Sequence, residues 1–245
     1  MRSMLRWAAC CAGALLLLQF FFIARIALWA VWAPESTTFE RSQAWQVAQS
    51  KGGIPPWRQQ WVPYSNISNH LKRAVIASED DAFADHDGVN WDAIEKAWEK
   101  NAKAEKKAEA RPSPTNGKPT KPPKVVGGST ITQQLAKNLF LSGERTLLRK
   151  AQEFVLTMSL ELLLSKERIL EIYLNHVEWG EGVFGAQAAA QHYFRKNAAQ
   201  LSAYEAARLA VMLPRPKYFE KLPNSAYLSG RAEVIVARMP SAQLP

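Results

Sequence analysis

The chain has 245 residues, enough for one sizeable domain or two small ones with a core that needs no disulfide or metal to hold it. Its 47% hydrophobic residues and nine tryptophans argue against a disordered chain. The 31 Lys and Arg against 22 Asp and Glu give a net charge of +9, which favours an anionic partner such as nucleic acid, anionic lipid or a phosphorylated substrate.

The first predicted element is an apolar segment at the N-terminus. The stretch from Trp7 to Ala24 has no charged residue, Arg2 and Arg6 precede it, and the apolar character resumes after Arg25. A run of this length can span a bilayer, with Arg25 reaching to the interface. A cleaved signal peptide is the alternative, but the apolar region is longer than a usual signal core. We expect residues 1–33 to form a cytoplasmic tip and transmembrane anchor, with the remainder exported.

Both cysteines, Cys10 and Cys11, lie in this apolar segment. The exported part therefore contains no thiol, which excludes disulfides and cysteine metal sites there. We expect its fold to be held by packing alone.

Helical periodicity dominates the rest of the chain, and no convincing alternating strand pattern is present, so we predict a mainly α fold. Residues 34–60 contain glycine and proline pairs and are expected to be a linker before a domain at 61–245. The predicted helices are 68–78, 91–98, 146–164, 165–175, 186–193 and 206–213, several of them with a Ser or Thr cap.

Residues 99–124 interrupt this pattern. They are rich in Lys, Ala, Glu and Pro and have hardly a bulky apolar side chain. Such a segment cannot bury enough surface to fold alone, so we expect a mobile insertion in the domain.

The segment from Gly127 to Leu141 contains the most closely spaced residues suited to ligand binding. A glycine pair lets the backbone approach a ligand closely, and a helix N-terminus offers N–H groups to an anion. The simpler interpretation is a glycine turn followed by a Thr-capped amphipathic helix. The polar face of this helix would consist of Gln133, Gln134, Lys137 and Asn138. Amide groups and an ammonium group on one face favour a polar, anionic substrate.

Two carboxylates are candidates for catalysis. Glu79 ends an apolar helix, and Phe83 and His86 would lie on the same face if that helix continues. Partial burial against the aromatic ring would raise the pKa of Glu79 toward the range of a general base. The alternative is a solvated acidic helix end with an ordinary histidine. Glu153 follows Arg149 by four residues, and a plain helical ion pair explains it equally well.

Four motifs, in this order, closely resemble those of the peptidoglycan glycosyltransferase family that polymerises lipid II with a lysozyme-like catalytic domain. They are EDxxFxxHxG at Glu79–Gly88, GGSTITQQLxKN at Gly127–Asn138, RKxxE at Arg149–Glu153 and KxxILExYLN at Lys166–Asn175. The chain most resembles the monofunctional biosynthetic members. The SxxK and KTG signatures of a transpeptidase domain are missing, and we expect no such domain after Pro214.

The resemblance implies that Glu79 removes the proton from the 4-hydroxyl of the acceptor N-acetylglucosamine. That oxygen attacks C1 of the donor N-acetylmuramic acid, undecaprenyl pyrophosphate leaves, and the linkage inverts from α to β-1,4. Such a leaving group needs charge neutralisation more than a proton, and Lys137, Arg145 and Lys150 can supply it. Glu153 is implied to be the second essential carboxylate. Its role stays open among organising the cations, holding a divalent ion such as Mg²⁺ or Mn²⁺, and stabilising positive charge on the sugar.

Further residues are assigned by the same resemblance. Asp80, Phe83 and His86 are expected to shape and orient the first carboxylate site. The substrate contacts implied for the second and third motifs come from Gly128, Ser129, Thr130, Gln133, Gln134, Lys137, Asn138, Arg145, Arg149 and Lys150.

The expected partners are lipid II, the growing glycan strand, membrane lipid, and cell-division or elongation proteins, but not nucleic acid. The expected location is the inner membrane, single-pass, with the N-terminus cytoplasmic and the catalytic domain periplasmic. Two alternatives stay open. A lytic enzyme of similar fold would need a protonated glutamate and a neutral sugar groove. A non-enzymatic, membrane-anchored basic module would bind anionic lipid or nucleic acid.

Overall fold

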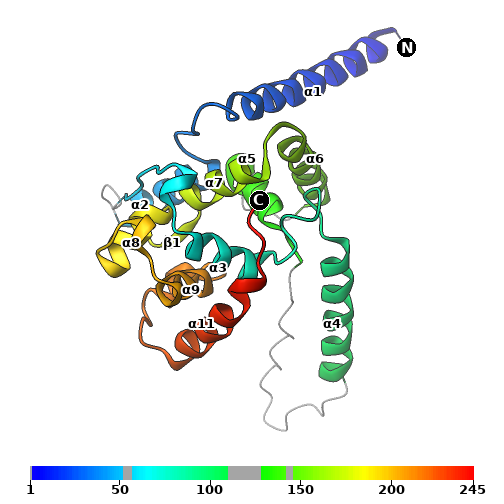
Figure 1. Ribbon diagram of the computed structural model, residues 1–245. Helices are drawn as coiled ribbons and strands as arrows, with labels where there is room; N and C mark the ends of the chain where they lie inside the picture. The colour runs from blue at the N-terminus through cyan, green and yellow to red at the C-terminus, as the bar shows by residue number, and fades with distance from the viewer. Residues whose placement is uncertain (1, 52–56, 110–127, 142–145) are drawn as a thin grey trace.

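The computed structural model describes residues 2–51, 57–109, 128–141 and 146–245. Most of this part of the chain is helical (Figure 1). The described strands are β1 (Glu178–Gly180) and β2 (Val183–Phe184), which form an antiparallel hairpin too short for sequence periodicity to indicate. The predicted mainly α fold, preceded by one apolar helix, is therefore confirmed.

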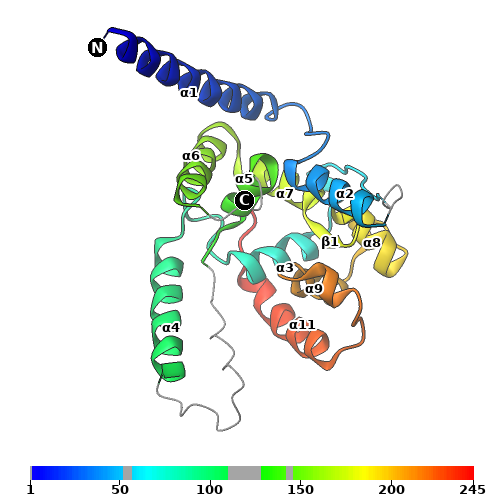
Figure 2. The same ribbon diagram turned by 180° about the vertical axis from the view of Figure 1, so that it is seen from behind.

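The apolar N-terminal segment forms helix α1 (Arg2–Leu28), which projects from one end of the molecule (Figures 1 and 2). Among the described helices it is the one whose length and composition allow it to cross a membrane. Its last turns pack against the domain, since Ile26 is buried and the rings of Phe22 and Trp29 each lie 5.1 Å from that of Phe140. The end of α1 is therefore part of the folded domain.

Helix α2 (Thr38–Lys51) lies in the predicted linker at 34–60, so the linker prediction is wrong for these residues. The backbone N–H of Thr37 donates to Glu40 Oε2 at 2.6 Å, and the N–H of Glu40 donates to Thr37 Oγ1 at 3.0 Å. These reciprocal bonds are those of a capping box, which is a sequence pattern of helix starts. The linker prediction relied on the glycine and proline pairs and did not take this pattern into account. Glu40 is fully buried and its Oε1 lies 2.9 Å from His176 Nδ1, which joins α2 to the domain.

The remaining helices form the body of the domain. Helix α3 (Asn69–Glu79) packs against α9 (Ala203–Met212) and α11 (Ala226–Arg238), while α5 (Ile131–Phe140) packs against α6 (Leu147–Leu163) and α7 (Lys166–His176). Helices α8 (Ala186–Phe194) and α10 (Pro216–Phe219) and the 3₁₀ turns Tyr64–Asn66, Ala198–Gln200 and Met239–Ser241 complete the described elements.

Helix starts agree with the predicted caps. The side chains of Ser68, Thr130, Thr146, Ser165 and Ser202 each accept a hydrogen bond from a backbone N–H in the first turn of α3, α5, α6, α7 and α9. Each of these short polar side chains satisfies a donor that the helix itself leaves unpaired.

Helix α4 (Trp91–Glu109) begins as predicted but continues past Trp98, so the first part of the predicted insertion at 99–124 is helical. Alanine, lysine and glutamate have high helix propensity, and Lys103 pairs with Glu99 one turn earlier at 3.2 Å. The rest of the insertion, from residue 110, lies outside the described residues. Helix α4 projects from the body at the end opposite α1, with α6 between them (Figures 1 and 2).

Gly185, which precedes α8, is the position where the fold most clearly requires glycine. Its φ is +81°, and an added Cβ would lie 2.5 Å from the carbonyl oxygen of Asn175. We expect Gly185→Ala to lower the free energy of unfolding by about 3 kcal/mol, from the left-handed backbone and the clash together.

The matched control is Gly230→Ala inside α11, where an added Cβ would meet nothing within 4 Å. This change should raise the free energy of unfolding by about 0.5 to 1 kcal/mol. Chemical denaturation of the full chain in detergent compares the two variants. Equal effects would contradict this account of Gly185.

Candidate active site

Glu79 is the last residue of α3, and the chain leaves the helix at Asp80, whose φ is −163°. The helix thus ends within one residue of the predicted boundary at 78 and does not continue through Phe83 and His86. Phe83 is instead fully buried, with the Lys166 ammonium 4.7 Å from the centre of its ring. Phe83 thus packs beneath the turn after Glu79, where it has no surface exposed to a substrate.

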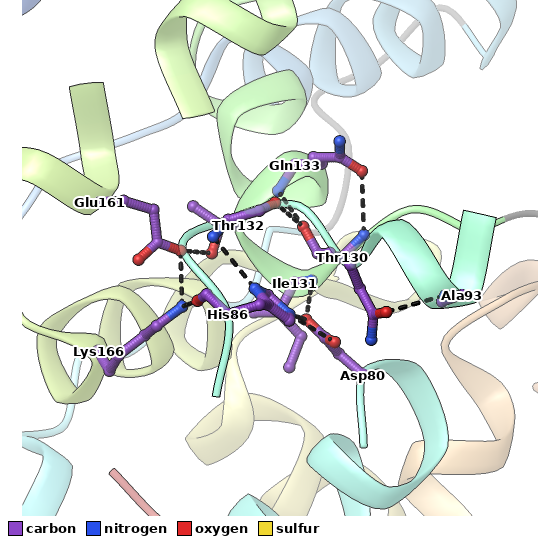
Figure 3. Close-up of polar contacts among 11 residues, drawn as sticks. Asp80, His86, Ala93, Thr130, Ile131, Thr132, Gln133, Glu161 and Lys166 are labelled. Carbon is purple, nitrogen blue, oxygen red and sulfur yellow. Dashed lines mark hydrogen bonds and ion pairs between the residues drawn. The ribbon is translucent and has the colours of Figure 1, made fainter. Parts of the chain in front are cut away.

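Asp80 joins this turn to the start of α5 (Figure 3). Its Oδ2 accepts the backbone N–H of Ile131 at 3.0 Å, and its Oδ1 lies 2.9 Å from His86 Nε2. The other ring nitrogen of His86 accepts the N–H of Gly88 at 3.1 Å, so the imidazole proton is on Nε2 and is donated to Asp80. Asp80 and His86 therefore position the turn that carries Glu79.

Thr130 and Gln133 form the cap of α5 (Figure 3). Thr130 Oγ1 accepts the N–H of Gln133 at 3.1 Å and donates to the carbonyl of Gly88 at 2.7 Å, while Gln133 Oε1 accepts the N–H of Thr130 at 3.1 Å. Both side chains are buried. For these two residues the simpler interpretation, a Thr-capped helix, describes the structure.

A partly buried ionic network supports the same turn on the side away from the cleft, and the sequence analysis assigned no role to its members. Glu161 Oε1 accepts from Thr132 Oγ1 at 2.6 Å and from Lys166 Nζ at 2.8 Å (Figure 3). Lys166 Nζ also donates to the carbonyl of His86. The sequence signal for Lys166 is its place at the start of the fourth motif.

Gln134 orients the Glu79 carboxylate. Gln134 Nε2 donates to Glu79 Oε2 at 3.0 Å, and the hydroxyl of Tyr173 donates to Gln134 Oε1 at 2.9 Å. Burial raises the pKa of Tyr173 well above its ordinary value, so its hydroxyl keeps the proton that it donates. Tyr173 belongs to the fourth motif, and its place there is the signal that could have indicated it.

Burial is the largest influence on Glu79 and raises the pKa of its carboxyl above the ordinary value. Hydrogen bonds from Gln134 and Ser78 lower this pKa in part, the charge of Asp80 raises it, and the charge of Lys137 lowers it. Glu79 is therefore poised nearer to neutral pH than a solvated glutamate.

Two open clefts meet at Ser129. The first has a volume of about 290 Å³ and is lined by Ser78, Glu79, Asp80, Asp81, Asn90, Ala93, Lys96, Ala97, Lys100, Gly128, Ser129 and Thr130. The second has a volume of about 350 Å³ and is lined by Phe39, Ser129, Gln133, Gln134, Lys137, Asn138, Leu141, Arg149, Lys150 and Glu153. Gln134 lines the second cleft and contacts Glu79 in the first. The two clefts thus bring most of the predicted site residues together.

The second cleft contains a group of cations around Glu153. The Glu153 side chain is 5% exposed, and it pairs with Arg149 Nη1 at 3.2 Å and with Lys150 Nζ. Arg149 Nε is buried without a hydrogen-bond partner in the described residues. Of the predicted cations, Lys137, Arg149 and Lys150 line this cleft, whereas Arg145 lies outside the described residues.

The described residues do not form a metal site of the usual kind. Nowhere in that part of the chain do three His, Cys, Asp or Glu side chains come together, and both Glu153 oxygens contact cations. Divalent ions such as Mg²⁺ prefer several oxygen ligands. We therefore derive no catalytic step through a metal.

Residues 48–240 match the family model described as Transglycosylase. The chain belongs to the transglycosylase family. It is 53% identical over 94% of its length to the biosynthetic peptidoglycan transglycosylase of Herminiimonas arsenicoxydans, of which it covers 92%. It is 52% identical over its whole length to the protein of the same name from Burkholderia thailandensis, of which it covers 90%.

Family membership makes the chain a glycosyltransferase and confirms the resemblance drawn from the four motifs. The matched region begins at residue 48, inside α2, and so includes part of the predicted linker. It also contains every motif residue that lines the two clefts.

Asp80 should be critical for stability because it is buried and satisfies two partners from different segments. We expect Asp80→Ala to lower the free energy of unfolding by about 3 kcal/mol, since the Ile131 N–H and His86 would lose their acceptor. Asp81→Ala is the matched control. Its side chain is 70% exposed, and the loss of its pairing with Arg238 should cost less than about 1 kcal/mol. Denaturation profiles that overlay for the two variants would contradict the role given to Asp80.

Proposed function

We propose that the chain polymerises lipid II into β-1,4-linked glycan strands, with inversion at the donor anomeric carbon and release of undecaprenyl pyrophosphate. The observation that carries the proposal is the meeting of a carboxyl of raised pKa, Glu79, with a group of cations in adjoining clefts. A base and a charged cradle are the two elements that this transfer requires. The transglycosylase names of the relatives support the substrate class.

Glu79 takes the proton from the acceptor 4-hydroxyl. Gln134, held by Tyr173, fixes the direction of the carboxylate, because its amide nitrogen donates to Glu79 Oε2. The raised pKa makes the carboxylate a stronger base than a solvated glutamate. The acceptor oxygen then attacks C1 of the donor sugar as the bond to pyrophosphate breaks.

Lys137, Arg149 and Lys150 neutralise the charge that develops on the leaving pyrophosphate. Of the three roles left open for Glu153, organising these cations agrees best with its contacts, since it pairs with both Arg149 and Lys150. Ser129 is exposed between the two clefts and is placed to contact the sugar at the junction. The groups that contact substrate are positioned by Asp80, Phe83, His86, Thr130 and Gln133. The side chain of Asn138 and the backbone of Gly128 face the substrate.

We also propose that residues 1–33 anchor the enzyme in the inner membrane, with its N-terminus cytoplasmic and the catalytic domain periplasmic. The exposed apolar surface of α1 supports the anchor. Arg2 and Arg6 before the apolar run favour a cytoplasmic N-terminus. Anchoring confines the enzyme to the surface that holds its lipid-linked substrate and so raises their effective concentration.

The test is polymerisation of purified lipid II by the full chain in detergent. Wild type should form polymer, and Glu79→Gln should reduce the rate by about 10²- to 10⁴-fold because the general base is lost. Glu233→Gln, an exposed position on α11, should leave the rate unchanged. Gel separation of labelled product measures all three.

Finished glycan strands, offered in parallel, distinguish the lytic alternative. Their cleavage without polymerisation of lipid II would overturn the proposal. A chelator added to the polymerisation reaction tests the role of Glu153. We expect polymerisation to continue, and loss of activity that Mg²⁺ restores would assign ion binding to this site instead.

A further inference from the structure

Helix α6 has an exposed apolar face that the proposed function does not use. Leu148, Val155 and Leu162 recur every seven residues along this face, and all three side chains are exposed. Leu147 and Phe154 border the same face and are exposed as well. Large apolar side chains gathered on one face of a helix usually mark an interaction site.

The charged residues of α6 lie on its other side. Arg149, Lys150 and Glu153 line the second cleft, and Glu161 accepts a hydrogen bond from Thr132 of α5. Helix α6 therefore separates apolar from charged side chains in the way that is typical of a helix at the boundary between hydrocarbon and a polar surface.

Two polar side chains interrupt the apolar face, and both are satisfied by protein partners. Ser159 Oγ donates to the carbonyl of Val155 at 2.9 Å, within the helix. Gln152 forms a reciprocal pair with Gln19 of α1, in which each amide nitrogen donates to the other amide oxygen, at 3.0 and 3.2 Å. Polar groups inside a bilayer require partners of this kind, because no water is available to them.

The amide pair also indicates the depth of α6. Gln19 lies in the uncharged run Trp7–Ala24, and Arg25 follows it about 9 Å further along the axis of α1. With Arg25 at the membrane interface, Gln19 lies within the hydrocarbon. Gln152 lies there too, because its amide contacts that of Gln19.

Helix α4 carries two tryptophans suited to the border of this region. Trp91 and Trp98 are exposed and lie two turns apart on one side of α4. In both views α1 extends past α6 toward the side of the body where α4 also lies (Figures 1 and 2). Tryptophan is enriched where membrane and water meet, so these rings agree with a membrane along this side of the molecule.

We propose that the apolar face of α6 is immersed in the hydrocarbon of the bilayer beside α1, and that the Gln19–Gln152 pair holds the two helices together there. The inference rests on the proposed anchor, because α1 must span the membrane for Gln19 to lie within it. It makes α6 a second membrane-embedded element. The cations on the opposite side of α6 then lie at the level of the lipid headgroups, where a lipid-linked pyrophosphate is held.

The experiment measures lipid contact at two matched valines in the full chain. Val155 on α6 and Val234 on α11 are both 45% exposed. Val155→Cys and Val234→Cys are each made in a Cys10→Ala/Cys11→Ala background and labelled with nitrobenzoxadiazole. Both proteins are reconstituted into vesicles of phosphatidylcholine and phosphatidylglycerol. The quencher is either a nitroxide on the lipid acyl chains or iodide in the water.

The lipid nitroxide should remove most of the fluorescence of the label at Val155→Cys and little of that at Val234→Cys, and iodide should do the reverse. Equal responses of the two labels would overturn the inference. A label at Val155→Cys that neither quencher reaches would also overturn it, because protein such as a second copy of the chain would then cover this face.

Flotation of the same samples with the vesicles separates the inference from the proposals on which it rests. A chain that does not float would overturn the proposed anchor, and the inference with it. A chain that floats with an unquenched label at Val155→Cys would overturn the inference alone. Polymerisation of lipid II by the Cys10→Ala/Cys11→Ala background tests the proposed reaction independently.

The amide pair is tested by a double-mutant cycle in the same vesicles. Gln19→Leu and Gln152→Leu each leave one amide unpaired in hydrocarbon, so each should lower the midpoint of thermal unfolding by about 2 to 4 °C. The double variant should recover most of this loss, since no unpaired donor or acceptor remains. Single variants that unfold like wild type, or losses that add in the double variant, would contradict the role given to the pair.

Discussion

The structure of the site depends on the two bonds made by Asp80. This buried carboxylate accepts the Ile131 N–H at the start of α5 and the His86 imidazole from the turn after α3. A buried carboxylate is tolerated only where its oxygens are hydrogen-bonded, so both segments must meet at this point. Glu79 is the residue before Asp80, and α5 carries Gln134 and Lys137. The bonds of Asp80 thereby bring Glu79 and Lys137 into neighbouring clefts.

The two clefts surround their carboxylates differently, and the proposed glycosyl transfer uses this difference. Around Glu79, burial raises the pKa of the carboxyl, while the amide of Gln134 keeps it oriented. Around Glu153, the side chains of Arg149 and Lys150 are held in place by ion pairs with the carboxylate. A transfer that needs a base at one end and charge neutralisation at the other can use both environments in a single cleft system.

Local signals in the sequence predicted the helix starts well, because a Ser or Thr cap acts within one turn. They failed where a distant partner decides the structure. The linker expected at 34–60 contains helix α2, whose buried Glu40 meets His176 at the end of α7. The contact from Tyr173 through Gln134 to Glu79 likewise joins three separate helices. The motifs predicted which residues gather at the site. They did not separate Thr130 and Gln133, which cap α5, from Ser129, which remains exposed.

The most direct test of the central claim is the pH dependence of kcat/KM for lipid II polymerisation. A general base must be deprotonated, so the rate falls as pH falls through the pKa of Glu79, and burial should place that midpoint above the ordinary value of a glutamate. Gln134→Leu removes a donor that lowers this pKa, so its midpoint should lie higher still. A wild-type midpoint at or below the ordinary value, or a downward shift in Gln134→Leu, would contradict the account.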